Sequence, residues 1–385
     1  MSFVRTFVRD VSMVFALVVA AQVAAGEPAV VPVGLPKVTS KSYYLIDFST
    51  DKVLSASAAD EQLAPASLTK LMTAYVVFGA LQSGRIRLDE PAHVSSKAWR
   101  TGGTRMFIEL NTDVAIDDLV HGLLIQSGND AAVALAEHVA GSVDAFVGEM
   151  NAAAQKLGMR NTVYKNPHGL PARGHYTSAR DLAVLAKAII EEFPDYYGIS
   201  AEREFSYNGI AQHNRNALLS RDPSVDGLKT GYTEAAGYCL VTSAERDGMR
   251  LIAVVLGAPS PLVRNDGAQK LLDYGFANFE THKLYSAGQE LDNARVFGGE
   301  VEFARLGLTE DIYVTIPRGG YAKLAAKMDV LAQLAAPLVR GTAVGEVNIS
   351  FDGAPLVKTP VVVLANVLDG GVWARMRDEL GLLWE

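Results

Sequence analysis

The sequence is poor in cysteine and has no excess of basic residues. Its single cysteine, Cys239, excludes an intramolecular disulfide and a metal site built from several thiolates. The 35 lysines and arginines are outnumbered by 43 aspartates and glutamates, and the net charge of -8 argues against a nucleic-acid binder, which needs a basic face. The zinc-peptidase pattern His-Glu-x-x-His is absent, and His168 and His175 lack an evident third ligand. We therefore expect no metal and no other cofactor.

The sequence does contain enough apolar material for a globular protein. Hydrophobic residues make up 49% of the chain and charged residues 20%, which excludes wholesale disorder. At about 100–200 residues per domain, the 385 residues predict two domains.

The first 25 residues have the pattern of an export signal peptide. Arg5 and Arg9 give a positive start, residues 11–21 are almost wholly apolar, and Val23-Ala24-Ala25 offers small residues for cleavage. A retained membrane anchor is the alternative, but the apolar run is shorter than the roughly 20 residues that a spanning helix needs. We therefore expect this segment to be removed and the protein to act outside the cytoplasm, with residues 26–39 as an extended lead-in.

Residues 368–385 predict an amphipathic helix that contains two of the three tryptophans. At 100° per residue, its apolar side chains fall within an arc of about 120°. They are Val372, Trp373, Met376, Leu380, Leu383 and Trp384. An amphipathic helix with tryptophan at its apolar edge can lie in a membrane interface, or it can dock on its own domain. The pattern alone leaves both interpretations open.

Between these ends, the residue pattern changes near residue 280. Before that point, apolar periodicity predicts a mixed domain over residues 40–280, with helices over residues 67–81, 116–126, 130–140, 142–156, 178–191 and 266–279, and strands over residues 43–48, 52–55, 238–244 and 249–256. After it, a small antiparallel β domain is expected over residues 281–367, with strands over residues 295–303, 312–316, 346–351 and 360–364.

The first motif with chemical meaning is Ser67-Leu68-Thr69-Lys70, at the start of a helix that is hydrophobic on all sides. Positions i and i+3 lie on one helix face, so the amine of Lys70 can approach the hydroxyl of Ser67. A lysine kept neutral by burial and by a second cation can make a serine nucleophilic by taking its proton. Ser67 could instead be a helix N-cap, and Ser49-Thr50-Asp51-Lys52 matches the same spacing by chance in a polar turn.

Two further motifs supply polar groups. Ser127-Gly128-Asn129 lies between two expected helices, where a short loop can direct two side chains to one spot, although both residue types also favour helix starts. Lys229-Thr230-Gly231 should form an edge strand that faces the helices, although it could be an ordinary strand start. Lysine supplies positive charge, threonine a hydroxyl, and glycine leaves room for a substrate backbone.

The three motifs, in this order, are those of class A β-lactamases and penicillin-binding proteins. The chain resembles the low-molecular-mass penicillin-binding proteins, which are serine D-alanyl-D-alanine carboxypeptidases, over most of residues 38–385. Segments 166–170 and 175–182 are similar as well. The resemblance implies an α/β (α+β) β-lactamase/transpeptidase-like domain with a central antiparallel sheet flanked by helices. A small all-β domain and the terminal amphipathic helix would follow it.

The resemblance also implies residue roles. Ser67 would be the acylated nucleophile, Lys70 its general base, and Ser127 the relay that passes a proton to the departing D-alanine. The backbone N–H groups of Ser67 and Tyr232 would form the oxyanion hole. The residues that match the family's substrate-binding positions are Asn129, Lys229, Thr230, Gly231, Tyr232, Arg264 and, less closely, Arg215.

Among these residues, Asn129 would hold the substrate amide, while Thr230 and Arg264 would bind the terminal carboxylate. Lys229 would keep the site electropositive and help to hold the general base neutral. Some relatives have histidine where this chain has Tyr232, so the resemblance implies only a backbone role at that position.

The implied function is removal of the terminal D-alanine from peptidoglycan stem pentapeptides, with β-lactams as covalent inhibitors. The implied place is the periplasmic face of the inner membrane, whose surface the C-terminal helix would contact. A class A-like β-lactamase is one alternative, but no Glu-x-x-Leu-Asn string follows Ser127. A membrane-tethered scaffold with an inactive peptidase-like domain is another, which the intact motifs argue against. A transpeptidase or endopeptidase activity on the same site stays open.

Overall fold

The computed structural model describes residues 34–331 and 333–382, which form two compact units. The first unit ends at Asn278 and the second begins at Phe279. The expected signal peptide and most of the expected lead-in lie outside the described residues. Within the described ranges, no single helix is long and apolar enough to cross a membrane, although Asn129–Ala140 and Val143–Lys156 pass that test as a bent pair.

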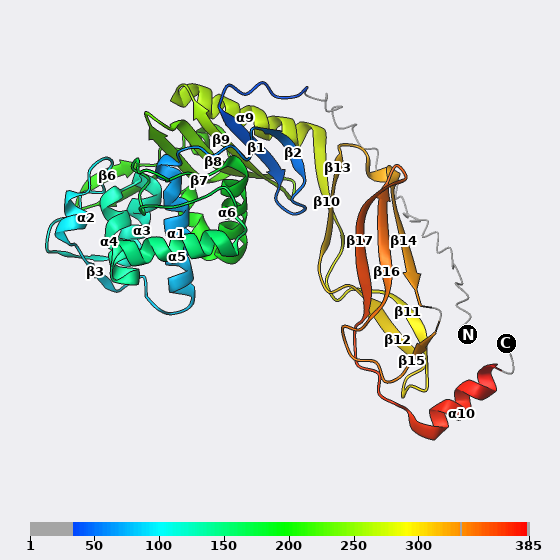
Figure 1. The fold of residues 1–385 in the computed structure, drawn as a ribbon. Coiled ribbons are helices and arrows are strands. Elements are labelled where there is room, and N and C mark those ends of the chain that lie inside the picture. Colours follow the sequence, from blue (N-terminus) through cyan, green and yellow to red (C-terminus); the bar gives the residue numbers. More distant parts are fainter. Residues whose placement is uncertain (1–33, 332, 383–385) are drawn as a thin grey trace. The chain divides into compact units, whose positions relative to one another are not determined.

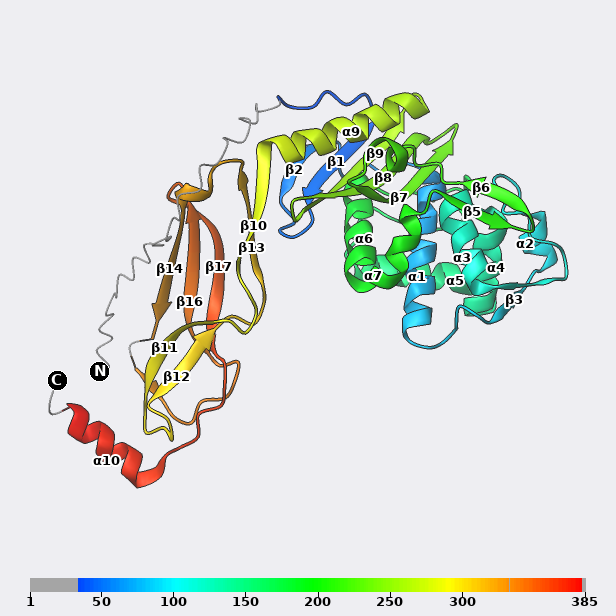
Figure 2. The same ribbon diagram turned by 180° about the vertical axis from the view of Figure 1, so that it is seen from behind.

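A five-stranded antiparallel sheet forms the centre of the first unit (Figures 1 and 2). Its strand order is β2-β1-β9-β8-β7, with the bounds β1 Ser42–Asp47, β2 Val53–Ser57, β7 Val225–Thr233, β8 Gly237–Arg246 and β9 Met249–Ala258. The expected tight hairpin is confirmed, because β8 and β9 pair on both sides of the Asp247-Gly248 turn. β7, which carries Lys229-Thr230-Gly231, is an edge strand as expected.

Helices cover both faces of this sheet. α9, Pro261–Asn278, packs on β8 and β9 from one face, and α6, Ala179–Glu192, packs on β1 and β9 from the other (Figure 1). The central helix α1, Thr69–Gln82, is buried on nearly all sides, as its apolar sequence predicts. The other elements of this unit are η1 Ala66–Leu68, β3 Pro91–His93, α2 Ser96–Arg100, β4 Asp113–Ala115, α3 Ile116–His121, η2 Gly122–Gln126, α4 Asn129–Ala140, α5 Val143–Lys156, α7 Pro194–Tyr197, η3 Gly198–Ala201, β5 Glu204–Tyr207, β6 Ile210–His213 and α8 Leu218–Arg221.

Helix α9 begins earlier than the sequence pattern predicts. The expected helix covers residues 266–279, whereas α9 starts at Pro261 and ends at Asn278. Its start has a local signal, because the backbone N–H of Val263 donates to the Ser260 hydroxyl over 3.2 Å and proline takes the first helical position, where a missing N–H costs nothing. Arg264 therefore lies in the first turn of a helix.

The second unit consists of β-sheets followed by a helix. A six-stranded sheet has the order β14-β16-β17-β12-β11-β15, and β10 pairs with β13. The expected antiparallel arrangement is confirmed for every pair except β11 and β15, which are parallel. The bounds are β10 Phe279–Tyr285, β11 Glu290–Phe297, β12 Phe303–Gly307, β13 Ile312–Pro317, η4 Tyr321–Lys323, β14 Leu324–Val330, β15 Leu334–Ala335, β16 Ala343–Phe351, β17 Ala354–Val363 and α10 Gly371–Leu382.

One expected strand of this unit is two strands. Residues 295–303 predict a single strand, but β11 ends at Phe297 and β12 begins at Phe303, with Arg295 paired to Phe303 across the hairpin. Gly298 has a φ of +69°, a conformation that glycine adopts without strain, and the chain reverses there. The prediction is wrong at this point because it did not treat the glycine pair as a turn.

Candidate active site

The turn before α1 brings the Ser67 hydroxyl next to the Lys70 amine. Residues 66–68 form a short 3-10 helix that runs into α1, and the Lys70 Nζ lies 3.2 Å from the Ser67 Oγ. Ala66 has a φ of 49°, in the left-handed region that non-glycine residues rarely adopt, so the backbone is strained directly before the serine. Lys70 is fully buried, whereas Ser67 lines a pocket.

Two other oxygen atoms surround the Lys70 amine. Its Nζ lies 2.6 Å from the Asn129 Oδ1 and 2.8 Å from the His168 carbonyl oxygen. The Asn129 amide is oriented by its other contact, since its Nδ2 donates to the Gly102 carbonyl over 2.7 Å. Both oxygens can only accept, so a neutral amine gives them its two hydrogens and turns its lone pair toward the Ser67 Oγ. This arrangement can take the serine proton.

Burial and neighbouring cations favour the uncharged form of that amine. Burial is the main cause that holds the pKa of Lys70 well below its usual value; the charges of Lys229 and Arg215 lower it further, and Asp130 opposes them. Burial, followed by the charges of Arg215 and Arg264, lowers the pKa of Lys229 to about 7. The cations around the neutral amine suit a substrate that carries a carboxylate.

The loop of residues 165–170 is attached to the first turns of α1. The Thr73 hydroxyl donates to the Pro167 carbonyl over 2.6 Å, and one turn earlier Lys70 donates to the next carbonyl of the loop, that of His168. Thr73 is fully buried, so the two contacts hold successive loop carbonyls against one helix face.

The same loop needs glycine and asparagine at two positions. Gly169 has a φ of +92°, and a Cβ there would collide with the Ala66 carbonyl, so glycine permits the close approach of this loop to the turn that carries Ser67. The Asn166 Oδ1 accepts the backbone N–H of Gly169 over 2.6 Å and that of His168 over 3.3 Å. The resemblance pointed to this segment, but no physical signal in the sequence indicated that its backbone reaches the lysine.

A π-helical turn presents the second motif. η2 continues α3 and ends at Gln126. Ser127 follows as its C-cap with a left-handed φ of 70°, and α4 then begins with Asn129. The Asn129 N–H donates to the Thr104 carbonyl over 2.7 Å. The motif is therefore connected to the loop before it as well as to Lys70.

Asp130 is a structural member of the site that the sequence analysis missed. Its fully buried carboxylate accepts the backbone N–H groups of Met106 and Phe107 over 2.9 and 3.0 Å, and so attaches their loop to the start of α4. An acid directly after the second motif was a visible signal. Acids in a first helical turn are common for electrostatic reasons alone, so this signal does not by itself indicate a buried contact.

Strand β7 brings the third motif against the turn of residues 66–68. A Cβ added to Gly231 would lie 3.2 Å from the backbone nitrogens of Ser67 and Leu68, so glycine lets the strand approach this closely. Lys229 is buried, and its Nζ donates to the Thr230 carbonyl over 3.2 Å.

These elements surround a pocket of about 330 Å³. Of the predicted residues, those that line it are Ser67, Ser127, Arg215, Thr230, Gly231, Tyr232 and Arg264, while Lys70, Asn129 and Lys229 are buried. Thr104, Tyr238 and Pro261 also line the pocket, although they belong to no motif. The Tyr238 ring stacks on that of Tyr232 with centroids 4.2 Å apart.

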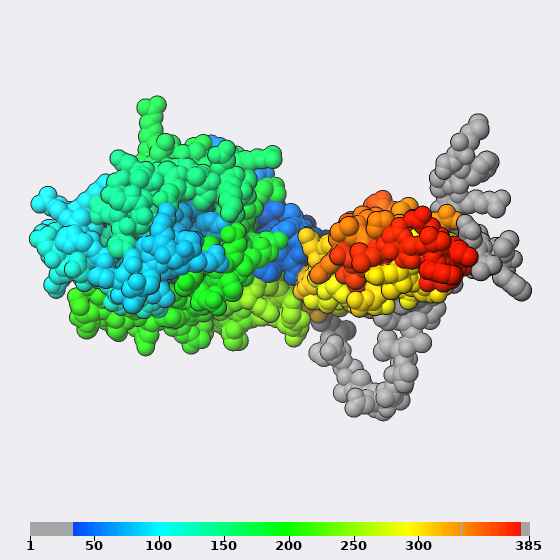
Figure 3. Space-filling model, turned by 90° about the horizontal axis from the view of Figure 1, so that it is seen from below, coloured from blue at the N-terminus to red at the C-terminus, as the bar shows by residue number. Residues whose placement is uncertain are grey.

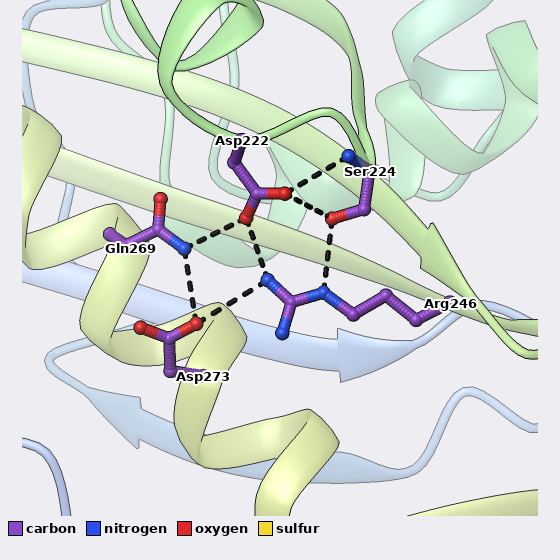
Figure 4. Close-up of polar contacts among 5 residues, drawn as sticks. All are labelled: Asp222, Ser224, Arg246, Gln269 and Asp273. Atoms are coloured by element: carbon purple, nitrogen blue, oxygen red, sulfur yellow. Dashed lines mark hydrogen bonds and ion pairs between the residues drawn. The ribbon is translucent and has the colours of Figure 1, made fainter.

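A cluster of five polar residues attaches α9 to the sheet (Figure 4). The Asp222 carboxylate accepts hydrogen bonds from Gln269 of α9 over 2.8 Å and from Arg246 of β8 over 2.6 Å, and Asp273 of α9 also pairs with Arg246. Burial alone would raise the pKa of Asp222, but hydrogen bonds from Gln269 and Ser224, and then the charge of Arg246, lower it to about 2. The carboxylate therefore stays ionised and holds the cluster together.

This cluster sets the position of Arg264 relative to Thr230. Asp222 lies just before β7, which carries Thr230, and the Gln269 that it binds lies just over one turn beyond Arg264 on α9. Arg264 is nearly buried, and its Nε donates to the Asn265 Oδ1 over 3.0 Å. Within residues 34–331 and 333–382, no group of three or more metal-binding side chains comes together.

Two protein-family models match the chain. One, described as D-alanyl-D-alanine carboxypeptidase, matches residues 29–260. The other, described as the C-terminal domain of penicillin-binding protein 5, matches residues 279–368. The two matches fall on the two structural units.

Curated relatives and solved structures agree with these models. The D-alanyl-D-alanine carboxypeptidase DacC of Escherichia coli is 43% identical over 351 residues, which are 89% of this chain and 88% of the relative. The crystal structure of penicillin binding protein 5 from Haemophilus influenzae matches with a TM-score of 0.82 and 41% identity, over 87% of this chain and 99% of that one. Penicillin-binding protein D2 from Listeria monocytogenes, solved in its ampicillin-bound form, matches with a TM-score of 0.58 and 31% identity, over 62% of this chain and 98% of that one.

Proposed function

The chain belongs to the D-alanyl-D-alanine carboxypeptidase family, and from this premise we propose that Ser67 is its nucleophile and Lys70 its general base. The protein is a serine D-alanyl-D-alanine carboxypeptidase. One observation supports the residue assignment. The Lys70 amine lies beside two oxygens that can only accept its hydrogens, those of Asn129 and His168, and beside the Ser67 hydroxyl, which can donate to its lone pair. Peptidoglycan stem peptides that end in D-Ala-D-Ala are the substrate.

The reaction proceeds through an acyl-enzyme. Lys70 takes the proton of Ser67, whose oxygen attacks the carbonyl of the penultimate D-alanine. The backbone N–H groups of Ser67 and Tyr232 stabilise the oxyanion. Ser127 passes a proton to the amine of the departing D-alanine, and water then releases the shortened peptide.

Substrate orientation depends on charge. The free carboxylate of the terminal D-alanine is held by Thr230 and Arg264, with Arg215 adding positive charge at the pocket lining. Lys229 keeps the field positive and the general base neutral. Asn129 orients the base through its Oδ1, which accepts from Lys70, and the family resemblance assigns it the substrate amide as well.

β-Lactams are covalent inhibitors in this proposal, because their strained amide and carboxylate present the same groups to Ser67 and the cations. The ampicillin-bound form of the Listeria relative supports this. A β-lactamase and a non-enzymatic scaffold are less well supported, since the relatives that match most of the chain are named as carboxypeptidases.

The protein acts at the periplasmic face of the inner membrane in this proposal, and α10 contacts that membrane. α10 packs on its own unit through Ala374 and Asp378, which are buried, and the Asp378 carboxylate accepts the Gly298 N–H over 2.6 Å. The apolar side is left exposed, with Val372 70%, Trp373 81% and Met376 48% accessible. A helix with an exposed apolar face and an interfacial tryptophan is suited to a bilayer surface.

The nucleophile assignment is tested by labelling with a fluorescent penicillin. Ser67→Ala should abolish labelling and the release of D-alanine from a pentapeptide, while Ser49→Ala, in the chance match to the motif, should leave both unchanged. Mass spectrometry should place the penicilloyl adduct on the peptide that contains Ser67. Labelling of Ser67→Ala at the normal rate would refute the assignment.

A further inference from the structure

We propose that the membrane-contacting surface is larger than α10 and includes an apolar rim formed by Val301, Val339 and Leu368. The occupant of this surface is the headgroup and upper acyl region of a phospholipid bilayer. The inference rests on the proposed membrane contact of α10 and extends it to the loops beside that helix.

The rim residues are exposed aliphatic side chains on three separate loops. Val301, Val339 and Leu368 are 44%, 67% and 58% accessible. Surface loops are usually built from polar residues and glycine, and isolated exposed apolar residues need no explanation. Three whose loops are hydrogen-bonded to one another and to the start of a helix with an exposed apolar face do need one.

Backbone pairing brings Val339 and Leu368 together. Leu338 and Val367 exchange two backbone hydrogen bonds of 2.9 and 2.8 Å. Val367 is buried in the core of the unit. Because successive residues of an extended segment point to opposite sides, Val339 and Leu368 point away from that core.

Further backbone contacts add Val301 and the start of α10. The Glu300 N–H donates to the Leu368 carbonyl over 2.9 Å, which places the neighbouring Val301 beside the rim. The Gly370 N–H donates to the Gly298 carbonyl over 2.9 Å, one residue before α10 begins. Backbone hydrogen bonds thus connect the three loops to one another and to the start of the helix.

The buried Asp378 holds α10 against this end. Its contact with the Gly298 N–H comes from the second half of the helix, so both ends of the first two turns are attached to one loop. Figure 3 shows α10 in red lying against the yellow and orange surface of the same unit. The helix is therefore fixed to its unit, and a bilayer that contacts its apolar face also lies close to the rim residues.

A bilayer fits these features better than a folded partner does. An interfacial helix buries its apolar face about 5–10 Å into the headgroup and acyl boundary. Loops that are hydrogen-bonded to the start of such a helix come within reach of the same layer. Aliphatic side chains scattered over several loop tips need no shape-complementary partner in order to enter lipid.

The test measures binding of the full chain to vesicles of phosphatidylethanolamine and phosphatidylglycerol. Val301→Asp, Val339→Asp and Leu368→Asp are compared singly and together with the wild type. Leu356→Asp is the matched control, because Leu356 is 40% exposed in the same unit but lies beside the Asp352-Gly353 turn, at the opposite end of β17. Penicillin labelling and thermal unfolding check that each variant is folded.

We expect each single rim substitution to lower the partition constant several-fold and the triple variant to lower it by about 10-fold or more, with Leu356→Asp unchanged. If the folded rim variants bound vesicles as well as the wild type does, the proposal that the rim contacts the bilayer would be wrong, and the α10 proposal would be unaffected. An equal loss of vesicle binding in Leu356→Asp would also contradict the proposal, because added negative charge anywhere in the unit would then explain the result. No binding by the wild type would contradict the α10 proposal itself.

Discussion

At the scale of single residues, the site depends on an amine that is buried among cations. Lys70 is fully buried, its pKa is lowered first by burial and then by Lys229, and two obligate acceptors orient it. Lys229 is itself buried, with a pKa of about 7. The protein accepts the cost of crowding positive groups because a neutral lysine can act as a base near neutral pH, whereas an exposed one would stay protonated.

The charge of Arg215 should influence both lysines. Arg215 lowers the pKa of Lys70 and of Lys229, so Arg215→Gln should raise both. With Lys70 as the proposed general base, acylation needs its neutral form, which is lost as the pH falls through its pKa. A raised pKa therefore moves the acidic limb of the acylation rate to higher pH. The rate of penicillin labelling measured across pH tests this, with Arg215→Lys as the control that keeps the charge. Superimposable limbs for the wild type and Arg215→Gln would contradict the electrostatic account.

The sequence predicts the parts of the site that are close together along the chain. Ser67 and Lys70 are one helical turn apart, so their contact follows from helix geometry. The contact between Lys70 and the His168 carbonyl joins residues 98 positions apart, and any residue type can supply a carbonyl. Asp130 was missed for a related reason: its partners are backbone N–H groups of a loop, which leave no mark on the sequence.

At the scale of elements, the loop of residues 165–170 orients the Lys70 amine through a backbone carbonyl. The Thr73 hydroxyl holds the Pro167 carbonyl, and Asn166 holds the turn at Gly169. The helix α1 thus uses two successive turns to orient one loop. Helix prediction from apolar periodicity located α1 correctly but could not reveal this use of a buried threonine.

Thr73→Val should slow acylation and reduce stability. Valine has nearly the same shape but no hydroxyl, so the Pro167 carbonyl is left unpaired at a cost of about 1–3 kcal/mol in the free energy of unfolding. The neighbouring His168 carbonyl then holds Lys70 less well, and we expect kcat/KM for D-alanine release to fall about 10-fold. Chemical denaturation and steady-state kinetics measure the two effects. Thr73→Ser keeps the hydroxyl and should retain most of the activity; a loss as large as that of Thr73→Val would mean that the methyl group matters instead.

Element boundaries were predicted less well than elements, and α9 is the clearest case. Its apolar pattern begins near residue 266, but the helix begins at Pro261, because Ser260 and the proline form a start signal that the periodicity does not contain. The five residues gained include Arg264, so the proposed carboxylate-binding residue lies in a helix and not in a loop. In the second unit, the glycine pair after Phe297 divides an expected strand in the same way.

At the scale of the whole molecule, the pocket and the proposed membrane-contacting surface belong to different units. The residues that line the pocket come from the unit that ends at Asn278, and so do the Asp222 cluster and the loop on α1. The apolar rim and α10 come from the unit that begins at Phe279. The length of the chain predicted two domains, and the structure shows that both polar clusters lie in the first of them.

A chain that ends at Asn278 should therefore still react with penicillin but no longer bind to membranes. Its sheet, α9 and the contacts that orient Lys70 and Arg264 are complete without the second unit. We expect its second-order rate of penicillin acylation to stay within about 2-fold of the full chain, since no interaction in the pocket is removed. Stopped-flow labelling measures this rate, and the shortened chain with Ser67→Ala controls for non-specific reaction. If the shortened chain were folded by circular dichroism but slow to acylate, the second unit would have to act on the active site itself, and the division of labour proposed here would be wrong.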